Sequence, residues 1–242
     1  MLNLNVFLFV GLPYIAMVVF LVGTIVRYRS SGFKVTSLSS QFLEGRRLFW
    51  ASIPFHFGIL VVFSGHLIAF LIPRGLLAWN ANPVRLIVLE VAAFAFGISV
   101  LVGVLGMLWR RLTDARVMMV TTKMDLIVEL MLLIQASLGL YIGYAERWGA
   151  SWFAADLTPY LRSLFMLGPD IVAVSAMPIG IKLHIITAFL IFAIFPFTRL
   201  MHILVAPFHY LTRPYQRVIW NWDRRAIRNP RSPWTEHRPR NN

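Results

Sequence analysis

Long apolar stretches recur along this chain, separated by segments that carry most of its charge. A helix of about 20 apolar residues crosses the hydrocarbon core of a bilayer. Hydrophobic residues make up 58% of the sequence and charged residues 14%, which excludes an ordinary soluble domain. The sequence therefore predicts an all-α integral membrane protein with five transmembrane helices. We expect them at residues 5–26, 49–72, 84–109, 124–144 and 176–205.

The basic residues predict how these helices are oriented. The five helices are followed in turn by five, two, four, two and eight lysines and arginines, where the second count includes Arg85 at the start of the third helix. Because basic loops stay in the cytoplasm, we expect the amino terminus outside and the carboxyl terminus in the cytoplasm. The first apolar run has its positive charge after it, so we expect a retained span and not a cleaved signal peptide.

The loop of residues 145–175 is longer than the others and is expected outside. Within it the apolar side chains follow a helical spacing, at Leu157, Tyr160, Leu161 and Leu164. This spacing predicts a short helix lying on the outer surface.

Cysteine content and charge exclude several classes of protein. The chain has no cysteine, which excludes an iron–sulfur cluster, a thioether-attached haem, a disulfide and a thiolate zinc site within it. The net charge of +13 would suit nucleic acid, but the basic residues lie at the ends of apolar runs. We interpret them as topology signals and as contacts with membrane lipids or a partner protein, and expect no nucleic-acid binding. A transporter is disfavoured because the predicted helices contain few polar or broken stretches.

Four histidines lie within the apolar stretches. His56 and His66 belong to the second predicted helix, and His184 and His202 to the fifth. His184 and His202 are eighteen residues apart, so a continuous helix would place them on one face, roughly 27 Å apart along the axis. The same rise separates His56 from His66 by roughly 15 Å. Histidines inside a membrane are candidate functional residues, and imidazole is a haem ligand.

Depth in the membrane predicts how these histidines pair. The second helix would run outward and the fifth inward, so His56 and His202 lie near the cytoplasm and His66 and His184 near the outside. Two ligands of one metal, each about 2 Å from it, have nitrogens about 4 Å apart, so histidines on one helix cannot share it. The pairing therefore predicts two bis-histidine haems, with irons roughly 21 Å apart.

Two other interpretations of the histidines compete with haem. A histidine in a membrane helix can be a structural residue held by hydrogen bonds, but four that pair by depth make this coincidence less favoured. Zinc is disfavoured because no carboxylate or cysteine stands at ligand spacing around them. Gly58 and Gly65 are expected to let a flat macrocycle approach the backbone, and Pro196 is expected to bend the fifth helix.

Short motifs accompany the histidines. They occur at residues 39–41 (Ser-Ser-Gln), 55–60 (Phe-His-Phe-Gly-Ile-Leu), 65–66 (Gly-His), 110–112 (Arg-Arg-Leu), 121–122 (Thr-Thr), 197–202 (Phe-Thr-Arg-Leu-Met-His) and 207–216 (Pro-Phe-His-Tyr-Leu-Thr-Arg-Pro-Tyr-Gln). Together they resemble the gamma subunit of membrane-bound respiratory nitrate reductase, from the first helix to about Val218. The resemblance implies a five-helix membrane domain binding two haem b groups over residues 1–218, followed by a basic cytoplasmic tail at 219–242. It also implies the same haem ligands as the depth argument, His66 with His184 outside and His56 with His202 inside.

The resemblance implies a function as well. Gamma subunits oxidise quinol near the outer face of the bacterial or archaeal cytoplasmic membrane. They pass electrons inward to an iron–sulfur beta subunit and a molybdenum alpha subunit, where nitrate is reduced. The rival interpretation is a related di-haem subunit of another quinone-linked respiratory complex, such as a sulfur-metabolising one, because haem ligation does not name the terminal acceptor.

The resemblance also suggests a quinol site. In the family a basic residue, usually lysine, opens the third helix and helps to bind quinol, and Arg85 takes that place here. We expect the site among Gly65, His66 and Arg85, with Glu90 as a candidate proton acceptor. Arginine keeps the charge of lysine but changes its geometry, so both menaquinol and ubiquinol stay open as substrates.

Charged residues at the predicted cytoplasmic ends have two interpretations. Arg111 and Arg199 are expected to hold haem propionates, and the alternative is that they extend to the membrane surface. Asp125 and Glu129 are four residues apart and share a face of the fourth helix. Their simplest interpretation is as carboxylates that are hydrogen-bonded, protonated or paired with arginine.

Overall fold

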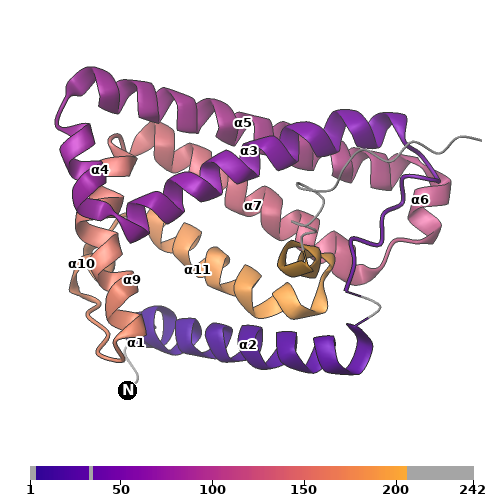
Figure 1. Ribbon diagram of the computed structural model, residues 1–242, viewed down its shortest axis with the longest axis horizontal. Coiled ribbons are helices and arrows are strands. Elements are labelled where there is room, and N and C mark those ends of the chain that lie inside the picture. Colours follow the sequence, from indigo (N-terminus) through magenta and orange to yellow (C-terminus); the bar gives the residue numbers. More distant parts are fainter. Residues whose placement is uncertain (1–3, 33–34, 206–242) are drawn as a thin grey trace, which may run out of the picture. The chain divides into compact units, whose positions relative to one another are not determined.

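The computed structural model describes residues 4–32 and 35–205, in which all regular secondary structure is helical (Figure 1). Five helices of this part are long and apolar enough to cross a membrane, which confirms the predicted number of spans. The first span comprises α1 (Leu4–Val6), η1 (Phe7–Gly11) and α2 (Leu12–Ser31). The others are α3 (Arg46–Leu71), α5 (Pro83–Thr113), α7 (Lys123–Ala145), and α11 (Ile179–Ile194) with η4 (Phe195–Phe197). The predicted tail at 219–242 and two further histidines, His209 and His237, lie outside the described residues.

Short helices connect the spans at both ends of this bundle. At one end, which we call the α9 end, lie α4 (Pro73–Asn80), α8 (Gly149–Trp152), η3 (Phe153–Leu157), α9 (Thr158–Phe165) and α10 (Val172–Ala176). At the opposite end, which we call the α6 end, lie α6 (Ala115–Met119) and the loop of residues 35–45. The predicted short helix is confirmed as α9, in which Tyr160 and Leu164 are buried, while its position on the outer surface stays a prediction. The helix α4 begins at Pro73, and α6 follows Asp114, whose side chain accepts the amides of Arg116 and Val117.

Side-chain caps fix where three of the spans begin. The side chain of Asn82 accepts hydrogen bonds from two amides of the first turn of α5, where Pro83 needs none. Thr122 and Asp125 form a reciprocal capping box at the start of α7. The carboxylate of Glu44 accepts the first free amides of α3. These residues satisfy the amides that a helix start leaves without partners.

The α9 end is tied to the first span by two tyrosines. The Tyr160 hydroxyl donates to the carbonyl of Phe9 at 2.8 Å, and the Tyr14 hydroxyl donates to the carbonyl of Leu164 at 3.0 Å. Phe9, Tyr160 and Leu164 are fully buried in one hydrophobic cluster. Burial raises the pKa of Tyr160, so its hydroxyl stays protonated and remains a donor.

The closest contact between spans joins α3 to α5 through glycines. A Cβ on Gly103 would lie 2.6 Å from the backbone nitrogen of Phe55, and one on Gly58 would lie 2.8 Å from the carbonyl oxygen of Phe96. Gly58 therefore serves helix packing, and the expectation that it faces a macrocycle is wrong. Gly65 differs, because a Cβ there would meet nothing within 4 Å.

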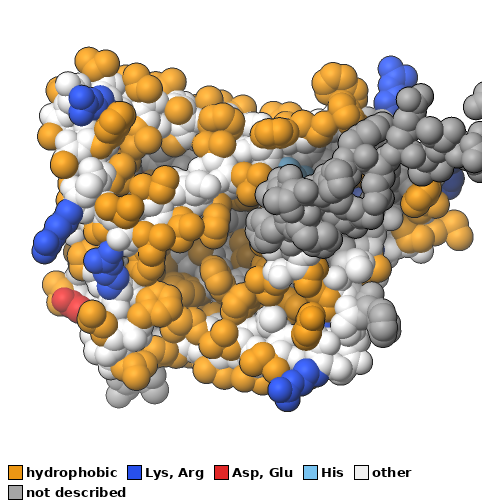
Figure 2. Space-filling view, in the orientation of Figure 1, with side chains coloured by type: hydrophobic (Ala, Val, Ile, Leu, Met, Phe, Trp, Pro, Cys, Tyr) orange, Lys and Arg blue, Asp and Glu red, His pale blue; other side chains and the backbone are white. Residues whose placement is uncertain are grey.

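The surfaces of the spans suit a lipid environment. Figure 2 shows hydrophobic side chains over the middle of the bundle, with lysines and arginines towards its two ends. The apolar residues of the spans are largely exposed, while the helices satisfy their own backbone groups, as a bilayer requires. The chain is a multi-pass membrane protein.

The fifth span departs from the prediction of one helix over residues 176–205. After α11, residues Phe195–Phe197 form a 3₁₀ turn and Thr198 is extended, with φ −116° and ψ 175°. The 3₁₀ helix η5 (Arg199–Val205) follows. Pro196 causes more than the expected bend, because it has no amide to continue the helical ladder. His184 and His202 therefore do not share one face of a continuous helix, and the predicted axial separation does not apply to them.

The α3–α5 contact predicts a test of stability. We expect Gly103→Val to lower the free energy of unfolding by about 1–3 kcal/mol, because the added methyl groups collide with the backbone of α3. The measurement is thermal unfolding in detergent, followed by helical circular dichroism. Gly168→Val is the control, since a Cβ there meets nothing within 4 Å. Equal melting temperatures for the two variants would contradict the account.

Candidate functional site

His56 of α3 and His202 of η5 face each other, as predicted from depth. Their ring centroids are 6.3 Å apart and their planes are inclined by 60°. Two imidazole nitrogens that each lie about 2 Å from a shared metal place the ring centroids about 6 Å apart. The pair therefore has the separation that a metal between the two rings requires.

Both rings are oriented by hydrogen bonds to backbone carbonyls. His56 Nδ1 lies 2.7 Å from the Ser52 carbonyl, and His202 Nδ1 lies 2.6 Å from the Arg199 carbonyl. A carbonyl can only accept, so each Nδ1 carries a proton, and in the neutral ring Nε2 then has the free lone pair. This is the tautomer that a metal-binding histidine needs, with its second nitrogen held by a backbone group.

His66 of α3 is oriented in the same way. Its Nδ1 donates to the Val62 carbonyl at 2.8 Å, which leaves Nε2 free. The ring meets Phe153 edge-on, with centroids 5.4 Å apart.

His184 is held differently from the other three histidines. The side-chain oxygen of Gln135, in α7, accepts a hydrogen bond from the Thr187 hydroxyl. The amide nitrogen of the same side chain therefore faces His184 and donates to its Nε2 at 3.1 Å. The other ring nitrogen, Nδ1, is buried and has no hydrogen-bond partner among the described residues. Gly139 lies against the ring, where a Cβ would approach Cε1 to 3.2 Å. Sequence reasoning missed Gln135, and its signal was a lone amide in an apolar span.

The surroundings of the histidines fit a large flat group with two axial ligands. Gly65 borders open space beside His66, and Figure 2 shows a hollow between α3 and α2. Among the described residues no cluster of three or more histidines, cysteines or carboxylates is placed to hold a metal ion. A zinc site needs three or four such ligands, whereas haem supplies four nitrogens of its own and needs only two.

Two of the four predicted quinol residues, His66 and Glu90, contact the segment Gly149–Leu157, which comprises α8 and η3. Glu90 accepts the amide of Ala150 at 2.8 Å, and His66 contacts Phe153. Asn80, at the end of α4, donates to the Ser151 hydroxyl at 3.1 Å. These contacts come from three different elements and meet within four residues of the chain.

Arg85 is exposed at the start of α5. Its guanidinium lies over the Trp79 ring, 4.8 Å from the centroid, and is thereby held at the turn between α4 and α5. Its neighbour in the chain, Asn82, caps the same helix. The cation is therefore fixed at the α9 end, close in sequence and structure to the turn that holds Asn80.

Arg111 and Arg199, the predicted propionate ligands, are both paired with carboxylates of α7. Arg111 lies 2.9 Å from Glu129, and Arg199 lies 2.6 Å from Asp125. A weaker contact of 3.5 Å links Arg111 to Asp125 as well. We call these four residues the ion cluster. Asp125 and Glu129 share a face as predicted, and both are buried.

Sequence reasoning missed the buried Arg110. Arg110 pairs with Glu44 at 2.7 Å and donates to the Ser40 hydroxyl and to both the Ser40 and the Glu44 carbonyls. It thereby fastens the loop of residues 35–45 to α5. Its signal in the sequence was the adjacent pair Arg110-Arg111, which places two guanidinium groups on different faces of one helix.

Comparison with known proteins decides the family. Residues 5–221 match the family described as "Nitrate reductase gamma subunit". The chain belongs to this family. It is 36% identical to the respiratory nitrate reductase 2 gamma chain of Escherichia coli K12, over 89% of this chain and 96% of that one. The nitrate reductase gamma chain of Bacillus subtilis 168 is 30% identical over 84% of this chain and 93% of its own.

A third relative agrees with these two. The respiratory nitrate reductase 1 gamma chain of Escherichia coli K12 is 34% identical, over 89% of this chain and 97% of that one. The resemblance seen in the sequence motifs is thus confirmed. As a member of the gamma subunit family, the protein is a membrane subunit of a respiratory nitrate reductase complex, and the family is one of cytochrome b subunits.

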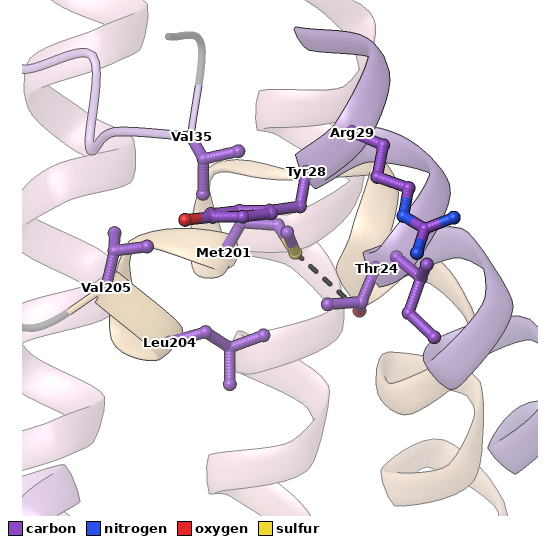
Figure 3. A pocket seen from close by; sticks show the side chains of 8 residues that line it. Thr24, Tyr28, Arg29, Val35, Met201, Leu204 and Val205 are labelled. Atoms are coloured by element: carbon purple, nitrogen blue, oxygen red, sulfur yellow. Dashed lines mark hydrogen bonds between the residues drawn. The ribbon is translucent and has the colours of Figure 1, made fainter. Parts of the chain in front are cut away.

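A pocket of about 300 Å³ lies apart from the facing histidine rings, between α2 and η5 (Figure 3). Its labelled lining includes Thr24, Tyr28, Met201 and Leu204, and the Thr24 hydroxyl contacts the Met201 sulfur at 3.8 Å. The lining is mostly apolar and lacks an acid–base pair. We therefore assign the chemistry of this gamma subunit to the histidines and not to this pocket.

Proposed function

We propose that this gamma subunit binds two haem b groups, one between His66 and His184 and one between His56 and His202. The observation that carries the proposal is the pair His56 and His202, whose ring centroids are 6.3 Å apart and whose Nδ1 atoms are both engaged with backbone carbonyls, so that the Nε2 atoms remain for a metal. His184 would exchange its Gln135 contact for the iron. Bound haem would supply one-electron redox chemistry.

We further propose that quinol is oxidised at the α9 end, among Gly65, His66 and Arg85. Oxidation of one quinol releases two electrons and two protons, so the site needs a cation or donor to orient the head group and a base to accept a proton. Arg85 is a fixed, exposed cation, and Gly65 leaves room beside His66. Glu90 is a base near the same segment, and one of its oxygens already accepts the Ala150 amide.

Electrons would then leave towards the α6 end. We propose that the amino terminus lies outside and the carboxyl terminus in the cytoplasm of a bacterial or archaeal cell. An iron–sulfur beta subunit and a molybdenum alpha subunit would dock on the cytoplasmic side, near the basic tail at 219–242. Releasing protons outside while electrons move inward would build a membrane potential.

Haem content tests the ligand assignment. A pyridine haemochrome assay should find two haems per chain, both low-spin. We expect His66→Ala and His184→Ala each to lose one and the same haem, and His56→Ala and His202→Ala each to lose the other. His237→Ala, in the tail, should keep both. Losses that cross between these pairs would disprove the pairing.

Quinol kinetics test the second site. We expect Arg85→Ala to slow haem reduction by quinol about 10- to 100-fold, the contribution of one hydrogen bond from a charged group, while both haems stay bound. Arg85→Lys should retain most of the rate, and Arg74→Ala, another exposed cation of the α9 end, should retain all of it. A wild-type rate in Arg85→Ala would place the site elsewhere.

Glu90→Gln provides a second arm of the same test. Glutamine still offers an oxygen to the Ala150 amide but cannot accept a proton. We expect slower quinol oxidation with an unchanged melting temperature and haem content. A wild-type rate would remove Glu90 from the proton route.

The orientation of the chain in the membrane is testable with two exposed methionines, one at each end of the helical bundle. The chain lacks cysteine, so Met166→Cys at the α9 end and Met119→Cys at the α6 end each create a single thiol. Met166 is 82% exposed and Met119 is 88% exposed. In intact cells a membrane-impermeant thiol reagent should label Met166→Cys, and should label Met119→Cys only after the cells are opened. The reverse labelling would invert the proposed topology.

A further inference from the structure

The break in the fifth span exposes backbone groups that a membrane protein must satisfy. We call residues 195–199, from the end of α11 to the first residue of η5, the His202 turn. Pro196 has no amide, and the extended Thr198 takes its own carbonyl out of the helical ladder. In an apolar environment each unsatisfied carbonyl costs several kcal/mol. The turn therefore needs donors from elsewhere in the protein.

Arg27 supplies these donors from α2. Its Nη1 donates to the Pro196 carbonyl and, at 3.0 Å, to the Thr198 carbonyl. One turn earlier, Gly23 lets α2 approach Pro196 so closely that a Cβ there would lie 2.9 Å from the proline ring. One guanidinium thus fixes both ends of the turn from the first span.

Asp125 fixes the other side of the turn from α7. Its two oxygens accept from Arg199 Nε at 2.6 Å and Arg199 Nη2 at 2.9 Å, a bidentate pair. Asp125 is only 6% exposed, and it is held in place by the Thr122 amide at 2.9 Å. The arginine therefore binds a rigid partner that is part of a helix start.

The carbonyl of Arg199 is the group that orients His202, since it accepts the Nδ1 proton of that ring at 2.6 Å. We propose that Asp125 and Arg27 are positioning residues, which fix the His202 turn so that His202 Nε2 faces His56. This inference rests on the proposed function, because it concerns the affinity and electronic state of the haem assigned to that pair. Neither residue need touch the haem itself.

The expected role of Arg199 as a propionate ligand makes the opposite prediction. If Arg199 served a propionate, removing the charge of Asp125 would free its guanidinium and strengthen haem binding. If Asp125 positions His202 through Arg199, the same change weakens binding of that haem. The sign of the effect separates the two roles.

The test uses Asp125→Asn and Arg27→Met in the whole complex, with the His66/His184 haem as an internal reference. Removing an outer-shell partner of a metal ligand typically costs 10- to 100-fold in metal affinity. We expect a loss of that size for the His56/His202 haem, with a shifted midpoint potential and altered low-spin paramagnetic resonance signal. The other haem should keep its content, potential and signal. Arg27→Lys, which retains a donor, should restore the inner haem in part.

Two matched variants control for a general loss of structure. Glu129→Gln removes the other carboxylate of the ion cluster, which pairs with Arg111 and not with Arg199, and Arg29→Met removes a cation two residues from Arg27. Both should leave the His56/His202 haem unchanged. If Asp125→Asn loses both haems through misfolding, Arg27→Met decides the question.

The outcomes separate this inference from the proposed haem ligation on which it rests. Unchanged potentials and haem content in Asp125→Asn and Arg27→Met, while His56→Ala and His202→Ala still lose one haem, would overturn the positioning role alone. Tighter haem binding in Asp125→Asn would instead assign Arg199 to a propionate. If His56→Ala and His202→Ala lose no haem, the proposed function itself fails.

Discussion

Inside a bilayer, a backbone group that leaves a helix must find its hydrogen-bond partner within the protein, and the fifth span is shaped by this requirement. Its interruption at Pro196 is tolerated because Arg27 of α2 satisfies two carbonyls of the turn and Asp125 of α7 binds Arg199. Beyond the interruption, His202 of η5 lies against His56 of α3. The opposing histidine, His56, belongs to α3, which packs closely against α5 through glycine contacts.

The same physical device recurs at three of the four histidines. A carbonyl three or four residues earlier in the chain takes the Nδ1 proton and leaves Nε2 as a ligand. His184 is the exception, with its Nε2 facing Gln135. The two proposed haem sites are therefore held by different means. The site at the α9 end involves a side-chain amide that can exchange its partner, whereas the other depends on the geometry of a backbone turn.

Much of this arrangement was predictable from the sequence. Apolar length and charge predict the first four spans to within five residues, whereas the fifth ends at Phe197 and not at Val205. The depth of the histidines predicts that His56 meets His202. The break at Pro196 was underestimated, because a single proline indicates a bend and the donors that stabilise a full interruption lie far away in the chain, at Arg27. The partners of Arg110 and Arg199 were likewise hidden, since ion pairs between distant segments leave no local spacing. Gly58 was misinterpreted because the sequence does not distinguish a glycine that packs against another helix from one that borders open space.

The two ends of the bundle divide the proposed chemistry. At the α9 end, a carboxylate and a histidine contact one short segment, and an exposed cation lies over Trp79 of α4. Towards the other end, near the proposed docking side, Arg110 joins the loop of residues 35–45 to α5, and Arg111 and Arg199 pair with carboxylates of α7. The most direct test of this account is to locate iron in the intact complex by anomalous diffraction at the iron absorption edge. Within this chain the account predicts two iron positions, one between Nε2 of His56 and His202 and one between Nε2 of His66 and His184. A single iron within this chain, or an iron bound by any other pair of its residues, would contradict it.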